Sequence, residues 1–318
     1  MENINKRTKP LLSICIPTYN RADVLFHCIN SIVQNKSFND DIEIFISDNA
    51  SSDNTKDIVQ SFVKKYNNII YIRQNKNIGG ELNFIYVLEN ANGHFRKLHN
   101  DYNIFTENGL QILLNHIKRE RDSKDLLYFI HSQKKDFQII QNLNEFINVV
   151  KLSATWISSY GFWAEDFINL ENKKEKIATQ FMQVDWFLRI FEKKNRCKIC
   201  YGDYTTRYKF KSSQGGYNFI KVQHLNYINM FIPYYQKGVI NIDTIKRLKR
   251  DSYSFLLNWL WKLRVKKDKE YSYSTNNGIE VLFKSCGHYY WFYTDPIKKI
   301  IKYSLKEIFN LFNYKTKL

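Results

Sequence analysis

A short apolar run near the N-terminus, Leu11–Ile16, constrains the fold of this chain more than any other stretch. Its length and its β-branched residues predict a buried strand of a parallel sheet. Pro17 is expected to end the strand, because proline has no N–H to donate to a neighbouring strand. Asn20 is then expected to cap a helix that begins near Arg21. A strand that turns into a helix N-terminus is typical of ligand-binding edges in open α/β sheets, although an ordinary connection has the same features.

The alternation of strand and helix continues through the first 120 residues. Further strands are predicted over residues 42–47, 69–73 and 94–98, with amphipathic helices between them. Residues 107–118 form the last predicted helix of this series. This order predicts an α/β fold in which a mostly parallel, right-handed sheet lies between layers of helices. The sequence contains neither the glycine pattern of a dinucleotide-binding turn nor a P-loop.

Polar side chains gather where three of the predicted strands end. The clusters are Thr18–Asn20, Asp48–Asp53 and Asp101–Asn103. Because the carboxyl ends of parallel strands share one edge of a sheet, we expect the three clusters to converge there. Each cluster alone is also compatible with a capping turn, but together they indicate a polar binding site.

The composition narrows the class of partner. A net charge of +17 over 318 residues favours polyanions such as nucleic acid, anionic lipid or phosphorylated substrates. No nucleic-acid-binding motif is present, so we do not expect nucleic acid as a partner. The sequence lacks an apolar run of membrane-spanning length and a signal peptide, which predicts a cytoplasmic protein. The five cysteines are odd in number and scattered, and the single C-x-x-C, Cys197–Cys200, is only a weak sign of a metal or redox site.

Three motifs carry a resemblance to a known family. Ser13–Arg21, Ile46–Thr55 and Asn77–Gly79 resemble the family 2 glycosyltransferases, which have a GT-A (Rossmann-like) fold. The similarity is good over residues 11–120 and weak over residues 150–210. It implies an inverting, metal-dependent transferase that moves a sugar from a nucleotide-sugar, most often a UDP-sugar, to an acceptor. The products expected from the resemblance are bacterial surface glycans: capsule, lipooligosaccharide or O-antigen.

The resemblance also divides the chain into three parts. Residues 1–120 would form the nucleotide-sugar-binding half of the GT-A domain, and residues 121–215 the acceptor-binding half. Residues 216–318 would form a helical, basic and aromatic extension. Ser212–Asn218, at the junction, is expected to be a loop, either a lid over the donor or a plain linker.

The donor site can be transferred residue by residue from the family's motifs. Asp48 would hydrogen-bond the base, because a carboxylate can accept from a pyrimidine N–H. Asp53 would line the same pocket, or it would simply cap the following helix. The positions expected to bind the nucleotide-sugar are Pro17, Tyr19, Arg21, Asp48, Asp53, Asn77 and Gly79.

The family's acidic metal motif falls at Asp101 and Asn103. Mn²⁺ or Mg²⁺ prefers hard oxygen ligands and would bridge the diphosphate of the donor. Asn103 stands where the family usually has Asp, so its amide oxygen would add a ligand without adding charge. A second alignment uses Asn100 with Asp101, and His99 is a further candidate ligand, although a packed histidine fits the strand end equally well.

Asp185 is the candidate catalytic base. The stretch Gln183–Arg189 resembles the family's Glu-Asp-Trp-x-x-x-x-Arg motif, with Val184 in place of the first acid. In the family this acid deprotonates the acceptor hydroxyl. The alternative is that Asp185 only caps its helix. The preceding stretch, Thr155–Ser159, is expected to line the acceptor cleft.

Basic amphipathic helices are predicted over residues 245–267 and 296–312. Such helices either lie on an anionic membrane surface or pack on the catalytic domain with their lysines exposed. The acceptor is therefore expected to be a saccharide or a lipid-linked saccharide, met at the inner face of the cell membrane. A different function stays open, since Asn103 and Val184 also fit a degenerate GT-A domain that binds a glycan or a partner.

Overall fold

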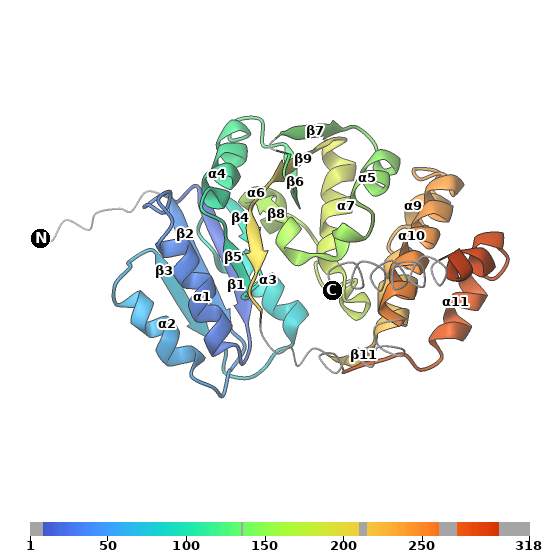
Figure 1. Cartoon of the computed structure of the whole chain (residues 1–318). Coiled ribbons are helices and arrows are strands. Elements are labelled where there is room, and N and C mark those ends of the chain that lie inside the picture. Colours follow the sequence, from blue (N-terminus) through green and yellow to red (C-terminus); the bar gives the residue numbers. More distant parts are fainter. Residues whose placement is uncertain (1–8, 135, 210–214, 261–271, 299–318) are drawn as a thin grey trace, which may run out of the picture. The chain divides into compact units, whose positions relative to one another are not determined.

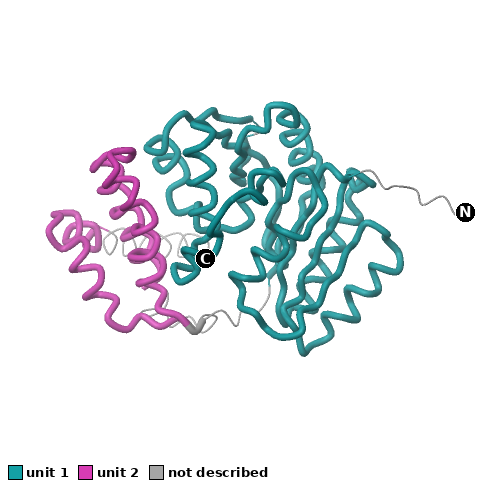
Figure 2. The backbone as a smooth tube through the Cα atoms, turned by 180° about the vertical axis from the view of Figure 1, so that it is seen from behind, with its two compact units in different colours: residues 1–210 teal, residues 211–318 magenta. Residues whose placement is uncertain are grey.

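The computed structural model describes residues 9–134, 136–209, 215–260 and 272–298. The chain forms two compact units, unit 1 over residues 1–210 and unit 2 over residues 211–318 (Figures 1 and 2). No helix in the described part of the chain is long and apolar enough to cross a membrane.

A five-stranded sheet forms the centre of unit 1. Its order is β3 (Ile69–Arg73), β2 (Ile42–Asp48), β1 (Leu12–Thr18), β4 (Phe95–Leu98) and β8 (Gly161–Trp163). The first four strands are parallel, and β8 pairs with β4 in the antiparallel direction. Every residue of β2 is buried, as expected for a strand that is covered on both faces.

Helices cover both faces of this sheet, which confirms the predicted α/β architecture (Figure 1). On one face lie α1 (Ala22–Val33) and α2 (Thr55–Val63), which also contact each other. The other face carries α3 (Gly80–Asn90), which packs against β1, β2 and β4. The crossovers therefore direct the carboxyl ends of β1, β2 and β4 to one edge.

The remainder of unit 1 is built on two smaller sheets. One has the order β6 (Leu126–His131), β9 (Cys197–Gly202) and β7 (Phe137–Ile140). The other pairs β5 (Asn103–Phe105) with β10 (Thr205–Arg207). Their helices are α4 (Gly109–Arg119), α5 (Leu143–Val150), α6 (Ala164–Ile168) and α7 (Met182–Lys194). Three 3₁₀ turns complete the unit: η1 (Lys151–Thr155), η2 (Ile157–Ser159) and η3 (Ile177–Thr179).

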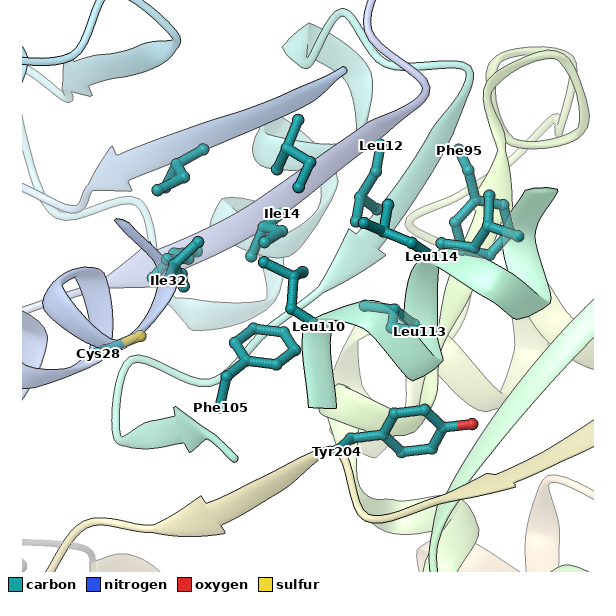
Figure 3. Close-up of a cluster of buried hydrophobic side chains, with 14 of the residues drawn as sticks. Leu12, Ile14, Cys28, Ile32, Phe95, Phe105, Leu110, Leu113, Leu114 and Tyr204 are labelled. Carbon is teal, nitrogen blue, oxygen red and sulfur yellow. The ribbon is translucent and has the colours of Figure 1, made fainter. Parts of the chain in front are cut away.

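One apolar core joins the main sheet to these later elements (Figure 3). Leu12 and Ile14 of β1 belong to the same buried cluster as Leu110 of α4 and Phe105 of β5. Tyr204, just before β10, belongs to this cluster as well. Because Phe105 is fixed in the core, the start of β5 and the loop before it have a defined place beside the end of β1.

Two local predictions at the end of the first strand are wrong. β1 continues through Pro17 to Thr18, because the N–H that proline lacks would point toward β4, where pairing has already stopped at Cys15. Asn20 does not cap α1. The N-cap position is Arg21, while Asn20 has a positive φ of 50° and accepts a hydrogen bond from the Ser52 N–H.

The C-x-x-C pair forms part of the core. Cys197 and Cys200 are both buried in β9 with free thiols, and burial raises the pKa of each. The described residues contain no group of three or more His, Cys, Asp or Glu side chains placed to hold a metal ion.

Unit 2 is mostly helical, which confirms the predicted helical C-terminal region. Its elements are β11 (Gly215–Asn218), the π-helix η4 (Lys221–Asn226), α8 (Tyr227–Asn229), α9 (Ile232–Gln236), α10 (Ile242–Leu260), β12 (Ser272–Ser274) and α11 (Gly278–Cys286). The buried His224 joins η4 to α10 and α11, with Ser252 Oγ 2.9 Å from one ring nitrogen and Ser285 Oγ 2.9 Å from the other. The predicted helix at 296–312 and the predicted loop at 212–218 lie partly outside the described residues.

Candidate functional site

The end of β1 and the loop after β4 meet through a buried hydrogen bond. Thr18 Oγ1 donates to Asp101 Oδ2 over 2.9 Å, although 83 residues separate the two in sequence. Arg21 lies close enough for its charge to favour the ionised form of Asp101. Asn20, in the same cluster as Thr18, bonds Ser51 and Ser52 of the remaining cluster, so all three polar clusters converge at one edge of the sheet.

Asp48, at the end of β2, is fully buried, and both of its carboxylate oxygens have partners. Oδ1 accepts the Ser51 N–H over 2.9 Å, and Oδ2 accepts the Tyr71 hydroxyl over 2.7 Å. The Arg73 guanidinium lies 3.6 Å from Oδ2. Burial, followed by the hydrogen bond to Asp48, raises the pKa of Tyr71, so this hydroxyl stays a donor. Asp48 therefore stabilises the conformation of the chain at the end of β2 through these internal contacts.

Asp53 holds the starts of two helices together. Its Oδ2 accepts the Ala22 N–H of α1 over 3.0 Å, and its Oδ1 accepts the N–H and the hydroxyl of Thr55 in α2. Partial burial alone would raise the pKa of Asp53, but these hydrogen bonds outweigh it and hold the pKa below its ordinary value. The N-cap position of α2 is Asn54 and not Asp53, but the Asp53 carboxylate accepts the N–H of the first residue of both helices.

The loop after β3 is attached to the end of β2 by paired amides. Asn49 Nδ2 donates to Asn77 Oδ1 over 2.8 Å, and Asn49 Oδ1 accepts the Ile78 N–H over 2.8 Å. Gly79 has a φ of 90°, which only glycine adopts without strain, and its N–H donates to Asn77 Oδ1. Sequence reasoning does not single out Asn49, although it directly follows Asp48.

The three donor-site candidates around the end of β1 differ in exposure. Tyr19 is 44% exposed, whereas Pro17 and Arg21 are half-buried. An exposed aromatic ring next to a half-buried guanidinium offers a stacking surface and a cation at the same edge.

Asp101 is a second buried acid of this edge. It is 8% exposed, and burial raises its pKa to about 6, against the opposing effects of Arg21 and of the Thr18 hydrogen bond. A buried carboxylate with a raised pKa destabilises the folded protein at neutral pH, which makes it a candidate for a functional group.

The side chain of Asn103 is oriented by Ser158, a residue from a distant segment. Its side-chain Nδ2 donates to Ser158 Oγ over 3.0 Å, and the same oxygen accepts the Asn100 N–H over 2.9 Å. Because the NH₂ group of Asn103 bonds Ser158, the amide oxygen of Asn103 points away from Ser158. The sequence places Ser158 in the stretch expected to line the acceptor cleft but does not predict its contact with Asn103, since that contact spans 55 residues.

His99 fits the packed alternative. It is 2% exposed, stacks on Phe105 with ring centroids 4.9 Å apart, and its Nε2 donates to the Asn103 backbone oxygen. Burial, then the charge of Lys97, lowers its pKa to about 3. The ring is therefore neutral and holds the loop in place.

These residues fit a hard divalent cation. Mg²⁺ is commonly held by one or two carboxylates together with substrate phosphates and water. The buried Asp101 carboxylate and the amide oxygen of Asn103 provide that kind of donor set, with one negative charge in place of two.

Asp185 lies in the first turn of α7 and is nearly buried. Its Oδ2 is 3.2 Å from Arg189 Nη1, one turn along the helix. Burial raises the pKa of Asp185, opposed by Arg189. Gln183, in the same turn, donates a hydrogen bond of 3.4 Å to the Thr155 carbonyl. Segment 155–158 is thus bonded to α7 and, through Ser158, to the segment after β4 that carries Asp101 (residues 99–103, the acid loop).

A cavity of about 500 Å³ lies beside Asn103 and Ser158. Aromatic and hydroxyl side chains line much of it, among them Trp156, Tyr204 and Thr206. Trp156 and Ser158 belong to the stretch expected to line the acceptor cleft.

Residues 13–194, more than half of the chain, match the family described as Glycosyl transferase family 2. The chain belongs to this family. A 113-residue segment is 39% identical to Abequosyltransferase RfbV of Salmonella typhimurium, covering 35% of this chain and 34% of that protein. A 164-residue segment is 32% identical to the Campylobacter jejuni GalNAc(5)-diNAcBac-PP-undecaprenol beta-1,3-glucosyltransferase, covering 45% of this chain and 52% of that protein. The matches therefore span about a third to a half of these relatives' lengths.

Solved structures of glycosyltransferases have a similar fold. S. aureus TarS 1-349 in complex with UDP-GlcNAc matches with a TM-score of 0.52 and 15% identity, over 80% of this chain and 76% of that chain. Mannosyltransferase PcManGT from Pyrobaculum calidifontis, in complex with GDP-Man and Mn²⁺, matches with a TM-score of 0.50 and 12% identity, over 95% and 88%. At these identities the likeness establishes the fold, and the GT-A fold expected for a family 2 glycosyltransferase is confirmed.

Proposed function

We propose that this chain is an inverting, metal-dependent glycosyltransferase that moves a hexose or related sugar from a nucleotide-sugar, a UDP-sugar in the first instance, to an acceptor sugar. The observation that carries the proposal is the buried Asp101, held by Thr18 and two residues before Asn103 in the chain. This acid lies at the sheet edge that also carries the loops of Asp48 and Asp53, in a chain that belongs to family 2.

The donor would bind across that edge. Tyr19 and Arg21 would contact the nucleotide, Pro17 would border it, and the rigid loops that Asp48 and Asp53 organise would shape the base pocket. Asn77 and Gly79, fixed by Asn49, would close the far side. Asp101 and Asn103 would hold Mn²⁺ or Mg²⁺, which when bound supplies positive charge to the diphosphate leaving group.

The acceptor side would be served by Asp185. Its carboxylate would take the proton of the acceptor hydroxyl as the oxygen attacks the anomeric carbon. The bond between that carbon and the diphosphate oxygen breaks in the same step, so the nucleoside diphosphate leaves with the bonding electrons and the configuration inverts. Arg189, which contacts Asp185 Oδ2, would keep the carboxylate in position.

The biological setting we propose is the assembly of a bacterial surface polysaccharide: capsule, lipooligosaccharide or O-antigen. The named relatives RfbV and the Campylobacter glucosyltransferase support such a setting. The acceptor would then be a saccharide or a lipid-linked saccharide.

We also propose peripheral contact with an anionic membrane at its cytoplasmic face. Residues 211–318 hold 19 of the 48 Lys and Arg residues but only 7 of the 31 Asp and Glu residues. Five large apolar or aromatic side chains of unit 2 are each more than half exposed: Ile279, Phe283, Tyr290, Tyr293 and Ile297. Aromatic rings beside lysines suit the interface of a bilayer. Sedimentation with vesicles tests this contact, because binding should require anionic lipid and should weaken with salt.

The test of the proposed activity is nucleotide release from a panel of UDP-, GDP-, CDP- and dTDP-sugars, with Mn²⁺, with Mg²⁺ and with EDTA. One donor class should be hydrolysed slowly without an acceptor and faster with one, and EDTA should stop the reaction. The substitutions at Asn103 and Val184 favour a second candidate, a degenerate domain that only binds glycan. Absence of release from every donor under all three conditions would support that second function.

A further inference from the structure

The cavity beside the acid loop has an uneven distribution of charge. Lys97 and Arg207 line it, whereas none of the described lining residues is Asp or Glu. A cavity lined by basic side chains and no acids favours ligands that carry a negative charge.

Lys97 is a buried cation whose protein contacts supply no carboxylate. It extends from β4, is 5% exposed, and its ammonium donates to the carbonyl oxygens of Leu98 and Ser158. The ammonium also lies 5.1 Å from the centroid of the Phe129 ring. Burial lowers its pKa to about 7, and the opposing effect of Cys15 is smaller. A negative group in the cavity would provide the missing counter-charge.

The cavity wall also carries an exposed aromatic ring. Trp156 is 54% exposed and offers a flat aromatic face to a sugar ring.

The cavity is also in the right place for the acceptor. Asn103 and Ser158 are shared between its wall and the acid loop, and segment 155–158 is bonded to the first turn of α7 through Thr155 and Gln183. A ligand held here would touch the segment that connects the proposed metal ligands to the helix of the proposed base.

We propose that this cavity binds the acceptor through an anionic group, a phosphate or a carboxylate, on or next to a sugar ring that stacks on Trp156. Lys97 and Arg207 recognise the anionic group. This inference rests on the proposed function and narrows its substrate to acidic acceptor saccharides.

The experiment uses three probes on the full chain: glucose 1-phosphate, methyl glucuronide and the neutral methyl glucoside, titrated by calorimetry in the presence of the best nucleotide. The phosphate or the carboxylate probe should bind at least about tenfold more tightly than the neutral one, as expected for a charge-assisted contact. Which of the two binds distinguishes a phosphorylated acceptor from a uronic-acid acceptor. Equal binding of all three, or binding of none at millimolar concentration, overturns the proposal.

Two variants locate the preference. Lys97→Met and Arg207→Gln should each reduce the advantage of the anionic probe to less than about threefold, with little effect on the neutral probe. Arg207 is exposed on β10, so Arg207→Gln decides the question even if Lys97→Met does not fold. Lys118→Gln is the matched control, because this exposed lysine of α4 does not line the cavity. Retention of the full preference in Arg207→Gln overturns the proposal.

The same titrations separate this inference from the proposed function. Nucleotide binding without any preference for an acidic probe removes the inference and leaves the transferase assignment intact. Loss of nucleotide binding in the wild-type protein counts against the proposed function itself.

Discussion

Replacing Asp101 with Asn should stabilise the metal-free protein at neutral pH. The pKa of Asp101 is raised from its ordinary 3.8 to about 6, so the folded state holds this proton more tightly than the unfolded chain does. Stability therefore falls as the pH rises from about 4 to about 6, and above that range the ionised Asp101 costs roughly 3 kcal/mol. Asn keeps an oxygen for the Thr18 hydroxyl and carries no charge, so it removes this cost.

The expected size of the effect follows from the pKa. A gain of roughly 3 kcal/mol in a unit of this size corresponds to a rise in melting temperature of about 6 to 12 °C. At pH 4.5 most of the cost is already absent in the wild type, and the gain should shrink to roughly 1 kcal/mol. Thermal unfolding in EDTA at pH 7.5 and pH 4.5 measures both values.

A matched control separates this effect from a general benefit of removing acids. Asp122→Asn removes an exposed carboxylate from the turn after α4, and its melting temperature should change little at either pH. A melting temperature for Asp101→Asn that is unchanged or lower at pH 7.5, or a gain that does not depend on pH, would refute the reasoning.

Three further substitutions test other parts of the site. Asp185→Asn should leave nucleotide affinity nearly unchanged and lower turnover by about a hundredfold or more, as expected for loss of a general base; loss of nucleotide affinity in a titration would contradict that role. Ser158→Ala should free the Asn103 amide to rotate and raise the concentration of Mn²⁺ needed for half-maximal activity, with rescue by Ser158→Thr; an unchanged metal requirement would show that Ser158 does not orient Asn103. Asp53→Ala should lose the N–H contacts at Ala22 and Thr55 and cost about 1 to 2 kcal/mol in denaturant unfolding, whereas Asp53→Asn should recover part of it; equal stability of both variants and wild type would remove the capping role.

The order of elements could be predicted because each element carries its own local signal. Strands such as Ile42–Asp48 are short, β-branched and bounded by polar turns, and the helices have regular apolar spacing. The family motifs then fixed the type of α/β fold. The end of β1 could not be predicted, because the effect of Pro17 depends on which neighbouring strand its nitrogen faces, and that is a property of the assembled sheet.

The edge of the sheet that carries the candidate site could also be predicted, because strand ends converge in a parallel sheet. The partners that orient each side chain could not. Thr18 and Asp101 are 83 residues apart, and Asn103 and Ser158 are 55 residues apart, so their contacts depend on the folded chain. Asp53 shows both cases. Its contact with α2 is local in sequence and could be predicted, whereas its contact with α1 depends on the folded chain.

The most direct test of the account is a thermal-shift titration of the wild-type protein with UDP, GDP, CDP and dTDP, with and without Mn²⁺. The account predicts that one nucleoside diphosphate raises the melting temperature and that Mn²⁺ increases the shift, since a ligand at a hundred times its Kd adds about 2.7 kcal/mol. No stabilisation by any of the four nucleotides, with or without Mn²⁺, would contradict the claim that this edge of the sheet is a nucleotide-sugar site.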